Sequence, residues 1–301
     1  MTVGEVDINV FDDIFSDRAS VYDSARFNLL NAAKVSQIKA LALFDTSGNP
    51  VCGQIFGLKD DGCWQAPFSA PFSALSAAPG IDLTSVSADD FYSRVSDYLQ
   101  APVRVICPPP VYATRMPVSS QSDWLDANYH YPMSHFADYE GHLSRSGRYN
   151  HHRWRKHVFE CFHTDDIERA YSIIARNRAA MGYPLAMSLE QVMETVKIVP
   201  AHFFVQTCEN QDSAAAMIYE ASPTVAQVIY WGDLPEFRPM RAMNALAYNV
   251  FSWFAENRPD IQSVDIGPAS SMGVRNEGLC AFKESIGCVY TPKAVYTFKP
   301  R

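Results

Sequence analysis

The sequence predicts a mixed α/β protein of the α+β class, made of two similar halves. The chain has 301 residues, a length that suits two domains or one large one. Hydrophobic residues make up 48% and charged residues 19%, which is typical of a globular protein with a large core. Patterns typical of helices and strands also follow one another in nearly the same order in both halves.

The first half reads as a helix, a strand hairpin, a third strand, a second helix and a last strand. Apolar residues at helical spacing predict a helix over 20–34. Ser87, followed by two acidic residues, predicts the start of a helix over 87–100. Short apolar runs between turns, the last of them stopped by three prolines, predict strands at 38–44, 51–58, 63–68 and 103–107.

The second half repeats this order. Thr164, an acidic first turn and a terminal glycine predict a helix over 164–182. Ser188 and Gln191 have the spacing of a capping box and predict a shorter helix over 188–200. The other predicted elements are strands at 202–208, 213–220, 225–233, 263–268 and 294–300, and helical segments at 240–257 and 278–288.

The two halves can be aligned through their turns. The predicted turns at 47–49 and 60–62 match those at 210–212 and 222–224, with nearly the same separation along the chain. The order of helix, hairpin, third strand, proline-containing loop, helix and strand also agrees. Internal structural duplication explains this agreement. The alternative is that mixed α/β chains resemble one another when they are compared at this level.

Charge and cysteine content narrow the function classes. The net charge of −8 argues against broad nucleic-acid binding, which usually needs a basic face, so we expect no DNA partner. The seven cysteines are widely spaced and form no CxxC motif, which is typical of reduced thiols. The N-terminal stretch is acidic, and no segment has the apolar length of a signal peptide or a membrane span. We therefore expect a cytoplasmic location and no membrane insertion.

Two stretches carry a resemblance to a known family. The segment "LSRSGRYNHHRWRKHVFE" at 143–160 is similar to the basic segment that opens the second half of FemAB-like proteins. The segment "GLCAFKESIGC" at 278–288 resembles the C-terminal Gly-x-x-x-Phe-Lys-x-x-x-Gly stretch of the same proteins. Together with the repeated order of elements, they make the chain resemble the FemAB-like, tandem branch of the GNAT acyl-CoA N-acyltransferase superfamily.

This resemblance implies a fold and an activity. It implies two tandem GNAT-like domains, 1–142 and 143–301, each with a mostly antiparallel mixed sheet flanked by helices. The C-terminal domain would hold the donor site. The implied reaction moves an acyl group from acetyl-CoA or another acyl-CoA to the primary amine of a small molecule or peptide, without a metal. A FemAB-like enzyme would instead use aminoacyl-tRNA as the donor.

Lys283 is the residue that the resemblance singles out. In FemAB-like enzymes the lysine of this stretch lines the acyl-transfer site, where a cation stabilises negative charge in the transition state. The resemblance thus implies a catalytic Lys283. The alternative is a solvated helix residue that pairs with Glu284 or Glu277.

A donor site is predicted where the strand that contains Trp231 leads through a loop into a long helix. Backbone N–H groups at a helix N-terminus bind phosphates well, and basic residues stand at this helix mouth. The predicted donor-binding residues are Arg238, Met240, Arg241 and Asn244. The alternative is that the arginines are ordinary surface charges or pair with Asp233 and Glu236. The match is one of position, because no Gln/Arg-x-x-Gly-x-Gly/Ala signature occurs.

Acceptor and base candidates lie on the neighbouring strands. Asp265 ends a strand and enters a loop of small residues that permits close approach to a ligand, although a plain connecting loop is the alternative. Trp231 is a further candidate for substrate binding. Glu220 and Tyr230 are candidates for the general base, because acyl transfer to an amine requires its deprotonation. Strand alternation places some of these groups on the face that lines the cleft, but it does not decide which of the two faces of the sheet that is.

The basic segment offers a second kind of ligand site. Arg148 and Arg153 are its predicted substrate-binding residues, because arginines interleaved with aromatic rings can hold a phosphorylated ligand or one RNA end. A solvated charged helix is the alternative. A metal site built from its histidines is not expected, since no HExxH motif or cysteine partner has workable spacing. The whole cluster is Arg145, Arg148, Tyr149, His151, His152, Arg153, Trp154, Arg155 and Lys156.

Three function classes remain open. The sequence contains no GxSxG, P-loop or GxGxxG motif, which argues against several other chemistries. Lys283 and the loop with Arg238 and Arg241 favour an N-acyltransferase. The missing phosphate-loop signature favours a non-catalytic ligand-binding protein on the same scaffold. A structural or partner-binding protein rests only on the aromatic content.

Overall fold

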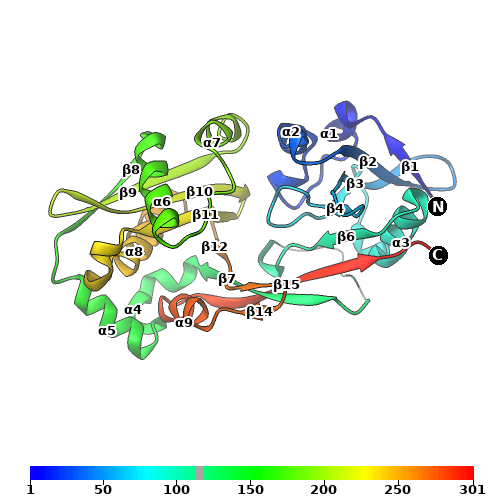
Figure 1. Cartoon of the computed structure of the whole chain (residues 1–301). Helices are drawn as coiled ribbons and strands as arrows, with labels where there is room; N and C mark the ends of the chain where they lie inside the picture. The colour runs from blue at the N-terminus through cyan, green and yellow to red at the C-terminus, as the bar shows by residue number, and fades with distance from the viewer. Residues whose placement is uncertain (113–117, 119) are drawn as a thin grey trace. The chain divides into compact units, whose positions relative to one another are not determined.

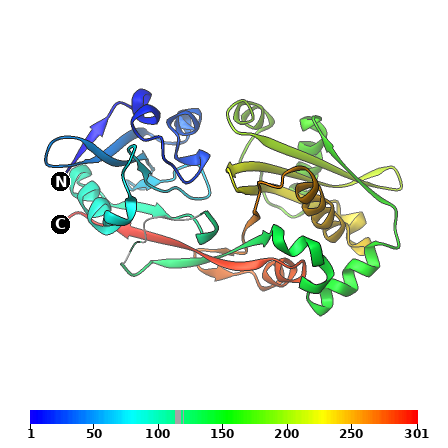
Figure 2. The same cartoon turned by 180° about the vertical axis from the view of Figure 1, so that it is seen from behind.

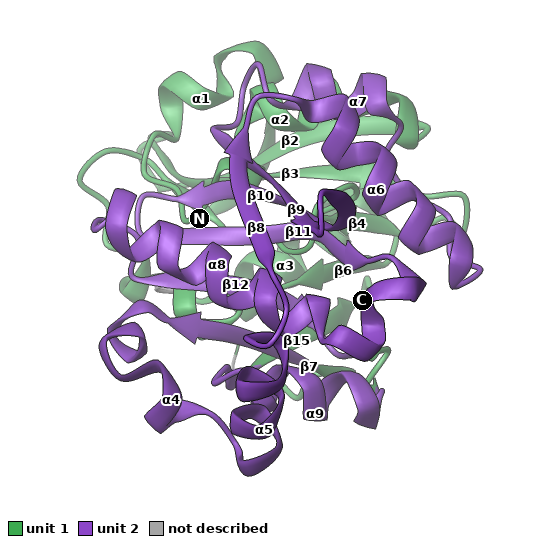
Figure 3. Ribbon diagram, turned by 90° about the vertical axis from the view of Figure 1, so that its left-hand side faces the viewer, with its two compact units in different colours: residues 1–126, 270–274, 292–301 green, residues 127–269, 275–291 purple. Residues whose placement is uncertain are grey.

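The computed structural model describes residues 1–112, 118 and 120–301, and the chain forms two compact units (Figure 3). The first unit contains Met1–Asp126, Ser270–Val274 and Pro292–Arg301, and the second contains Ala127–Ala269 and Arg275–Thr291. The end of the chain thus belongs to the first unit. The domain limits 1–142 and 143–301 stay a prediction from the sequence.

The first unit has one mixed sheet, with the strand order β1-β2-β3-β4-β6 and the C-terminal part of β15 beyond β6 (Figure 1). Its strands are β1 (Thr2–Val6), β2 (Gln37–Phe44), β3 (Pro50–Leu58), β4 (Trp64–Ala66), the short β5 (Ser76–Ala77) against β3, β6 (Val103–Ile106) and β15 (Val289–Phe298). The strands β1 to β4 are antiparallel, and β6 is parallel to β4. Helix α3 (Ala88–Leu99) makes the crossover that parallel pairing requires.

The helix predicted over 20–34 is wrong as a single element. The structure has a 3-10 turn η2 (Val21–Asp23), helix α2 (Ala25–Leu30) and a second turn η3 (Ala32–Lys34). The amide group of Asn28 donates to the carbonyl oxygens of Tyr22 and Ser24, and that of Asn31 donates to Phe27. These side chains compete with the helical hydrogen bonds, which divides the segment. The unit also contains η1 (Ile8–Val10), α1 (Phe11–Ile14), η4 (Leu83–Ser85) and η5 (Pro110–Tyr112).

The second unit repeats the plan of the first. Its strand order is β7-β12-β11-β10-β9-β8, with β15 beside β7. The antiparallel meander β9-β10-β11 corresponds to β2-β3-β4, and β12 is parallel to β11 as β6 is to β4. The predicted duplication of elements is therefore present. The strands are β7 (Trp124–Pro132), β8 (Phe159–Thr164), β9 (Ala201–Cys208), β10 (Gln211–Ser222), β11 (Val225–Asp233) and β12 (Ser263–Pro268).

Helices cover both faces of this second sheet (Figure 1 and Figure 2). Helix α6 (Ile167–Ala180) lies on one face and α8 (Ala242–Asn257) on the other. We call these the α6 face and the α8 face. The other elements of the unit are η6 (Met133–Asp138), α4 (Tyr139–His142), α5 (Arg145–Trp154), α7 (Leu189–Thr195), η7 (Pro235–Met240) and α9 (Glu277–Ser285). The hairpin of β13 (Ser270–Ser271) and β14 (Val274–Arg275) belongs to the first unit, except for Arg275.

Helix starts follow the predicted caps with one exception. Ser188 and Gln191 form the predicted capping box of α7, and Ser87 caps α3. Helix α6 instead begins after Asp166, whose side chain accepts a hydrogen bond from the N–H of Arg169. The predicted start at Thr164 is wrong because this residue ends strand β8.

One close contact fixes helix α5 against helix α9. A Cβ atom added to Gly147 would collide with the carbonyl oxygen of Ser285. Only glycine permits this approach of two backbones. The basic segment is thus held in place by an element that carries Lys283.

The pleat of the sheet assigns its side chains to the two faces. Ala226 and Val264 belong to the hydrophobic core under α8, so Gln227 and Asp265 point to the α6 face. A β-bulge changes the alternation in β11, because Met217 pairs with Tyr230 while Ile218 pairs with Val228. The core under α8 is made of the small and apolar residues of β7, β10, β11, β12, α8 and α9, among them Tyr129, Tyr131, Ala214, Ala216, Ile218, Leu246, Val250 and Phe251.

Candidate functional site

The parallel strands β11 and β12 part in the middle of the second sheet. Their pairing runs from Val225–Ser263 to Gln227–Asp265, after which β11 continues beside β10 and β12 continues beside β7. The bulge at Ile229 lies just past this point. Bulges occur often next to active sites, and ligands of mixed sheets bind beyond the carboxyl ends of parallel strands. The end of β11 is therefore a strong candidate for a ligand site.

Helix α8 begins directly after this strand end. The chain passes through η7 and reaches Arg241, the N-cap of α8, which has φ 66° and ψ 42°. This left-handed conformation is strained for arginine, and strained residues of this kind cluster at functional sites. No side chain caps the helix at this residue. The N–H groups and the dipole of the first turn thus favour an anion here.

The two arginines of the predicted donor site have different surroundings. The Nε atom of Arg238 lies 3.2 Å from Oδ1 of Asp233, so Arg238 pairs with an acid, which is the alternative that the sequence left open. Burial raises the pKa of Asp233, while its contact with Arg238 opposes the shift. The Nε atom of Arg241 is buried and has no hydrogen-bond partner among the described residues. Glu236 contacts Arg176 at 3.6 Å.

The other two predicted donor residues support this helix end. Asn244 is buried in the first turn of α8. The sulfur of Met240 lies 3.7 Å from the sulfur of Cys208 on β9. Gln206 of the same strand donates to the carbonyl oxygen of Ala242 at 3.1 Å, which fastens the start of α8 to the sheet. The structure thus brings all four predicted donor residues to one helix end.

Helix α6 adds two residues that the sequence did not single out. Asn177 donates to the carbonyl oxygen of Asp233 at 2.6 Å, and its own Oδ1 is buried without a partner in the described part of the chain. A side chain at Gly232 would collide with this amide, so the close approach depends on glycine. The guanidinium of Arg178 stands 5.4 Å from the ring centroid of Tyr230, and its Nε is also buried without a described partner.

Three buried polar atoms without a described partner therefore flank the end of β11. They are Oδ1 of Asn177, Nε of Arg178 and Nε of Arg241. Nearly all buried polar groups in native proteins have a hydrogen-bond partner, so each exception needs an explanation. A ligand on the α6 face would supply partners for Asn177 and Arg178, and an anion at the start of α8 would supply one for Arg241.

Tyr230 and Trp231 are neighbours that face opposite sides of the sheet. Tyr230 lies on the α6 face, where burial raises the pKa of its phenol and keeps it protonated. Trp231 packs against the core under α8, with its ring centroid 6.3 Å from that of Phe282. A single ligand on one face of β11 therefore does not contact both rings through the sheet.

Glu220 lies on the α8 face in a cluster of its own. Its Oε1 is 2.7 Å from Nε2 of His202, and Arg258 contacts the same carboxylate. Nδ1 of His202 in turn lies 3.1 Å from Nε2 of His163. Burial and the charge of Arg258 lower the pKa of His202 to about 4. The two base candidates from the sequence, Glu220 and Tyr230, thus stand on opposite faces.

Lys283 is buried rather than solvated, with 2% of its surface exposed. Its ammonium donates to the carbonyl oxygens of Ile266, Gly267 and Pro268 at 2.8, 2.7 and 3.0 Å. It also lies 5.8 Å from the ring centroid of Tyr129. These contacts place a positive charge at the end of β12. The catalytic role of Lys283 stays a prediction.

Asp265 is the centre of a buried polar ladder across β7, β12 and β11. Its carboxylate accepts hydrogen bonds from Gln227 Nε2 at 2.8 Å, from Asn128 Nδ2 at 2.9 Å and from the N–H of Gly267 at 2.9 Å. His130 of β7 is its register partner. No sequence motif pointed to Gln227, Asn128 or His130. The signal that would have found the last two is the alternation of polar and apolar residues in "WLDANYHYP".

The basic segment forms helix α5. Arg148 donates to the carbonyl oxygen of Leu143 at 2.8 Å, and Arg153 lies 3.5 Å from the hydroxyl of Tyr149. Both predicted substrate-binding arginines thus make their described hydrogen bonds within α5 and its N-terminal flank. A shallow pocket of about 590 Å³ borders the start of this helix, lined by Ser144, Arg145, Ser146 and Tyr149.

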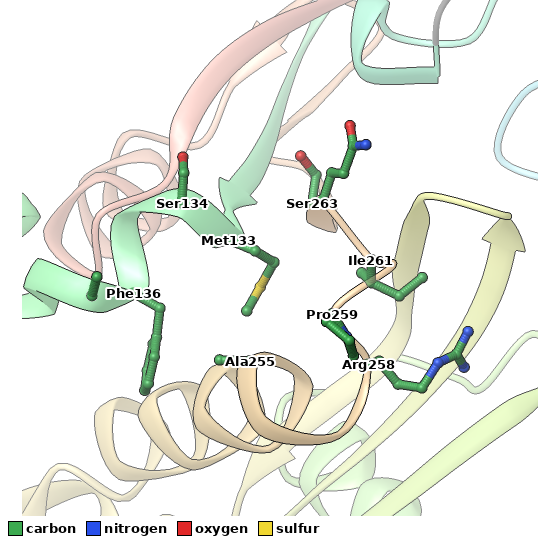
Figure 4. A pocket seen from close by; sticks show the side chains of 10 residues that line it. Met133, Ser134, Phe136, Ala255, Arg258, Pro259, Ile261 and Ser263 are labelled. Carbon is green, nitrogen blue, oxygen red and sulfur yellow. The ribbon is translucent and has the colours of Figure 1, made fainter.

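A second pocket, of about 730 Å³, lies at the C-terminal end of α8 (Figure 4). Met133, Phe136 and Ile261 surround it, while the guanidinium of Arg258 points away from these side chains. None of the residues predicted from the sequence to form a site lines this pocket.

Residues 1–112, 118 and 120–301 contain no group of three or more His, Cys, Asp and Glu side chains that could hold a metal ion. Within the same residues, no helix has the length and apolar character that crossing a membrane requires.

Comparisons with known proteins identify the fold. No protein-family model and no curated protein matches the chain. Among solved structures, FemX matches with a TM-score of 0.62 at 10% identity, over 99% of this chain and 97% of that one. The C-terminal domain of a putative lysylphosphatidylglycerol synthetase from Agrobacterium fabrum matches with a TM-score of 0.60 at 11% identity, over 96% and 90%. A tandem GNAT protein from the clavulanic acid biosynthesis pathway matches with a TM-score of 0.50 at 13% identity, over 87% and 82%.

The chain therefore has a GNAT-like fold of the FemAB type, built from two tandem domains, as the sequence predicted. The matched chains are covered almost from end to end, so the likeness includes both units. Identities this low show the fold and leave the activity to be argued from the site.

Proposed function

We propose that this protein is an N-acyltransferase that moves an acyl group from an acyl-CoA to a primary amine. The observation that carries the proposal is the end of β11, where Arg241 caps α8 and three buried polar atoms lack described partners. Similarity to a tandem GNAT protein supports the same class of reaction.

The donor's phosphates fit the start of α8. The first N–H groups of this helix favour an anion, and Arg241 adds a positive charge beside them. Arg238 would have to leave or share its contact with Asp233 to join the ligand. Met240 and Asn244 would line the same helix end, and Oδ1 of Asn177 could accept a hydrogen bond from an amide of the donor's arm.

The acyl carbonyl would then lie along the last residues of β11. Past Gln227, this strand has no parallel neighbour in the described pairing, so backbone N–H groups on that edge can face a carbonyl oxygen. Donors aimed at the developing oxyanion are the largest source of rate enhancement in acyl transfer. In this proposal the cation of Lys283 stands near the end of β12. Asp265 was predicted to bind substrate, but its carboxylate is fully buried and held by three donors, so it supports the strand end and does not touch the acceptor.

Aminoacyl-tRNA is the second candidate donor. It is supported by the similarity to FemX and by exposed cations in and just after helix α5, Arg153 and Lys156. Neutralising phosphates with such residues makes binding strongly dependent on salt. The acceptor would be a small-molecule or peptide amine in either case.

A binding protein without turnover is the third candidate. The absence of the GNAT phosphate-loop signature favours it. Such a protein would bind an acyl-CoA but leave the thioester intact in the presence of any amine.

Thermal unfolding of the full chain with acetyl-CoA, CoA and longer acyl-CoAs tests the donor. A ligand that binds only the folded state adds about 2.7 kcal/mol to the free energy of unfolding at a hundredfold excess over Kd, and so raises the melting temperature. We expect a shift that falls in Arg241→Ala and persists in Arg94→Ala, whose arginine pairs with Asp90 in the first unit. A shift with none of the CoA species, together with salt-dependent binding of tRNA, would favour the second candidate.

A further inference from the structure

We propose that His130 is the general base that accepts the proton of the acceptor amine, and that the carboxylate of Asp265 stabilises its protonated form. The inference rests on the proposed function, because an amine must be present to lose the proton. It assigns the base to a residue that neither the sequence motifs nor the structural similarities indicate.

The geometry of two strands places His130 beside a fixed carboxylate. His130 of β7 and Asp265 of β12 are direct register partners in an antiparallel pair. Side chains at such positions point to the same face, with Cβ atoms about 4.5–5.5 Å apart. Asp265 cannot turn away, because Gln227, Asn128 and Gly267 hold its two oxygens.

One ring nitrogen of His130 is anchored and the other is available. Nδ1 lies 3.3 Å from the hydroxyl oxygen of Thr291 on β15. Nε2 has no hydrogen bond to a described residue. When Nδ1–H donates to Thr291, Nε2 carries the lone pair that a base requires. The neighbour of a histidine thus sets which nitrogen is basic.

The charges around His130 keep it neutral and help it to accept a proton. Burial and the nearby His135 of η6 lower the pKa of His130, while the carboxylate of Asp265 opposes that shift. The imidazole is therefore unprotonated at neutral pH. Once it accepts a proton, the carboxylate of Asp265 stabilises the imidazolium. Thr291, the neighbour on β15, is uncharged.

The position of His130 and Asp265 in the sheet suits the transfer of an acyl group to an amine. Gln227 and Asp265 are the last partners before β11 and β12 part, so His130 lies on the next strand at the same level of the sheet. It stands on the α6 face with Tyr230. Glu220, the other base candidate, is on the α8 face and is engaged by Arg258 and His202.

The proposed step conserves atoms and charge. The amine nitrogen attacks the thioester carbonyl and forms the C–N bond, while its proton passes to Nε2 of His130. The C–S bond breaks, and the sulfur leaves with the electron pair of that bond. The imidazolium then returns the proton to the thiolate, which restores neutral His130.

A side-chain NMR titration of the full chain tests the protonation state without any substrate. We expect the His130 pKa to lie below 6.5 and to fall further in Asp265→Asn, because the stabilising charge is lost. Asp260→Asn, which removes an exposed acid paired with Arg258, should leave the value unchanged. Thr291→Val is the second variant, and it should shift the tautomer toward Nε2–H. A His130 pKa above 7, or one that does not respond to Asp265→Asn, would overturn the proposal.

Kinetics with acetyl-CoA and glycinamide test the role in transfer. Glycinamide is a suitable probe because an α-amino group has a pKa near 8 and is partly unprotonated at neutral pH. In His130→Gln we expect kcat to fall by about 10²–10⁴-fold with the KM for acetyl-CoA unchanged, and the acidic limb of the pH–rate profile to disappear. Added imidazole should restore activity to His130→Gly.

The outcomes separate the two proposals. A wild-type chain that binds acetyl-CoA and acylates glycinamide, with an equally active His130→Gln variant, refutes the role of His130 alone. A wild-type chain that neither binds nor consumes any acyl-CoA refutes the proposed function, and the base with it. Retained stabilisation of His130→Gln by acetyl-CoA shows that the variant is folded and binds the donor.

Discussion

The ammonium nitrogen of Lys283 lies 2.7 Å from the carbonyl oxygen of Gly267, and this contact joins helix α9 to the end of strand β12. The carbonyl oxygens of Ile266 and Pro268 accept from the same ammonium. A buried cation with three acceptors fixes the strand end next to Asp265. Lys283 thus has a structural role that its sequence context did not reveal.

Replacing Lys283 tests that role. Lys283→Met keeps the length of the side chain but leaves buried carbonyl oxygens without their donor, so we expect the free energy of unfolding to fall by about 3 kcal/mol. Urea denaturation measures it. Lys197→Met removes an exposed lysine and should change stability by less than about 0.5 kcal/mol. An equally small change in Lys283→Met would show that these contacts contribute little.

Arg241→Gly separates stability from ligand binding. A left-handed conformation costs an L-residue about 1–2 kcal/mol and glycine very little, so the variant should unfold at a higher temperature than wild type without ligand. It should also lose most of the stabilisation by acetyl-CoA. Differential scanning calorimetry with and without the donor checks both. A variant that is stabilised and still responds fully to acetyl-CoA would remove Arg241 from the site.

His202 should make stability depend on pH. Its pKa is about 4 in the folded chain and about 6.5 when unfolded, so the unfolded state binds the proton more readily. The contribution is complete above pH 6.5 and is lost as the pH falls through about 4, with a slope of at most about 1.4 kcal/mol per pH unit. Denaturation curves between pH 7 and 4.5 measure it. His202→Gln should flatten the curve, and an unchanged slope in that variant would assign the effect to other groups.

Gly147→Ala tests the contact between the basic helix and α9. The added methyl group would meet the carbonyl oxygen of Ser285, so the two helices must move apart. We expect a loss of about 1–3 kcal/mol in the free energy of unfolding. Gly278→Ala is the control, because its added methyl group meets only ordinary contacts and should leave the free energy of unfolding nearly unchanged. Gly62→Ala would be a poor control, since Gly62 has a positive φ. Equal stabilities of the Gly147 and Gly278 variants would contradict the close packing.

The elements that the sequence predicted well are those with strong local patterns. The meander at 201–233 and helix α8 have long apolar runs bounded by clear turns, and their limits agree with the prediction within a few residues. Strand β7 was missed although its residues alternate. Its polar side chains are buried because they bond to a strand more than a hundred residues away, as Asn128 does to Asp265. Such partners are not visible in a local pattern.

The sequence also did not show which side chains share a face of the sheet. The bulge at Ile229 shifts the alternation, so Tyr230 and Trp231 cannot be assigned without the register of β10. The pairing of Arg238 with Asp233 was one of two readings, and their spacing alone did not decide between them. The three carbonyl partners of Lys283 depend on how β12 ends. Local chemistry therefore indicated the residues, and tertiary pairing decided what they contact.

Acylation of an amine tests the proposed acyl transfer most directly. The full chain is incubated with acetyl-CoA and a panel of primary amines and small peptides, and the products are identified by mass spectrometry. We expect an N-acetylated amine and an equal amount of free CoA, both reduced in Arg241→Gly and in His130→Gln. Intact acetyl-CoA with every amine, alongside acylation when aminoacyl-tRNA is the donor, would contradict the acyl-CoA assignment.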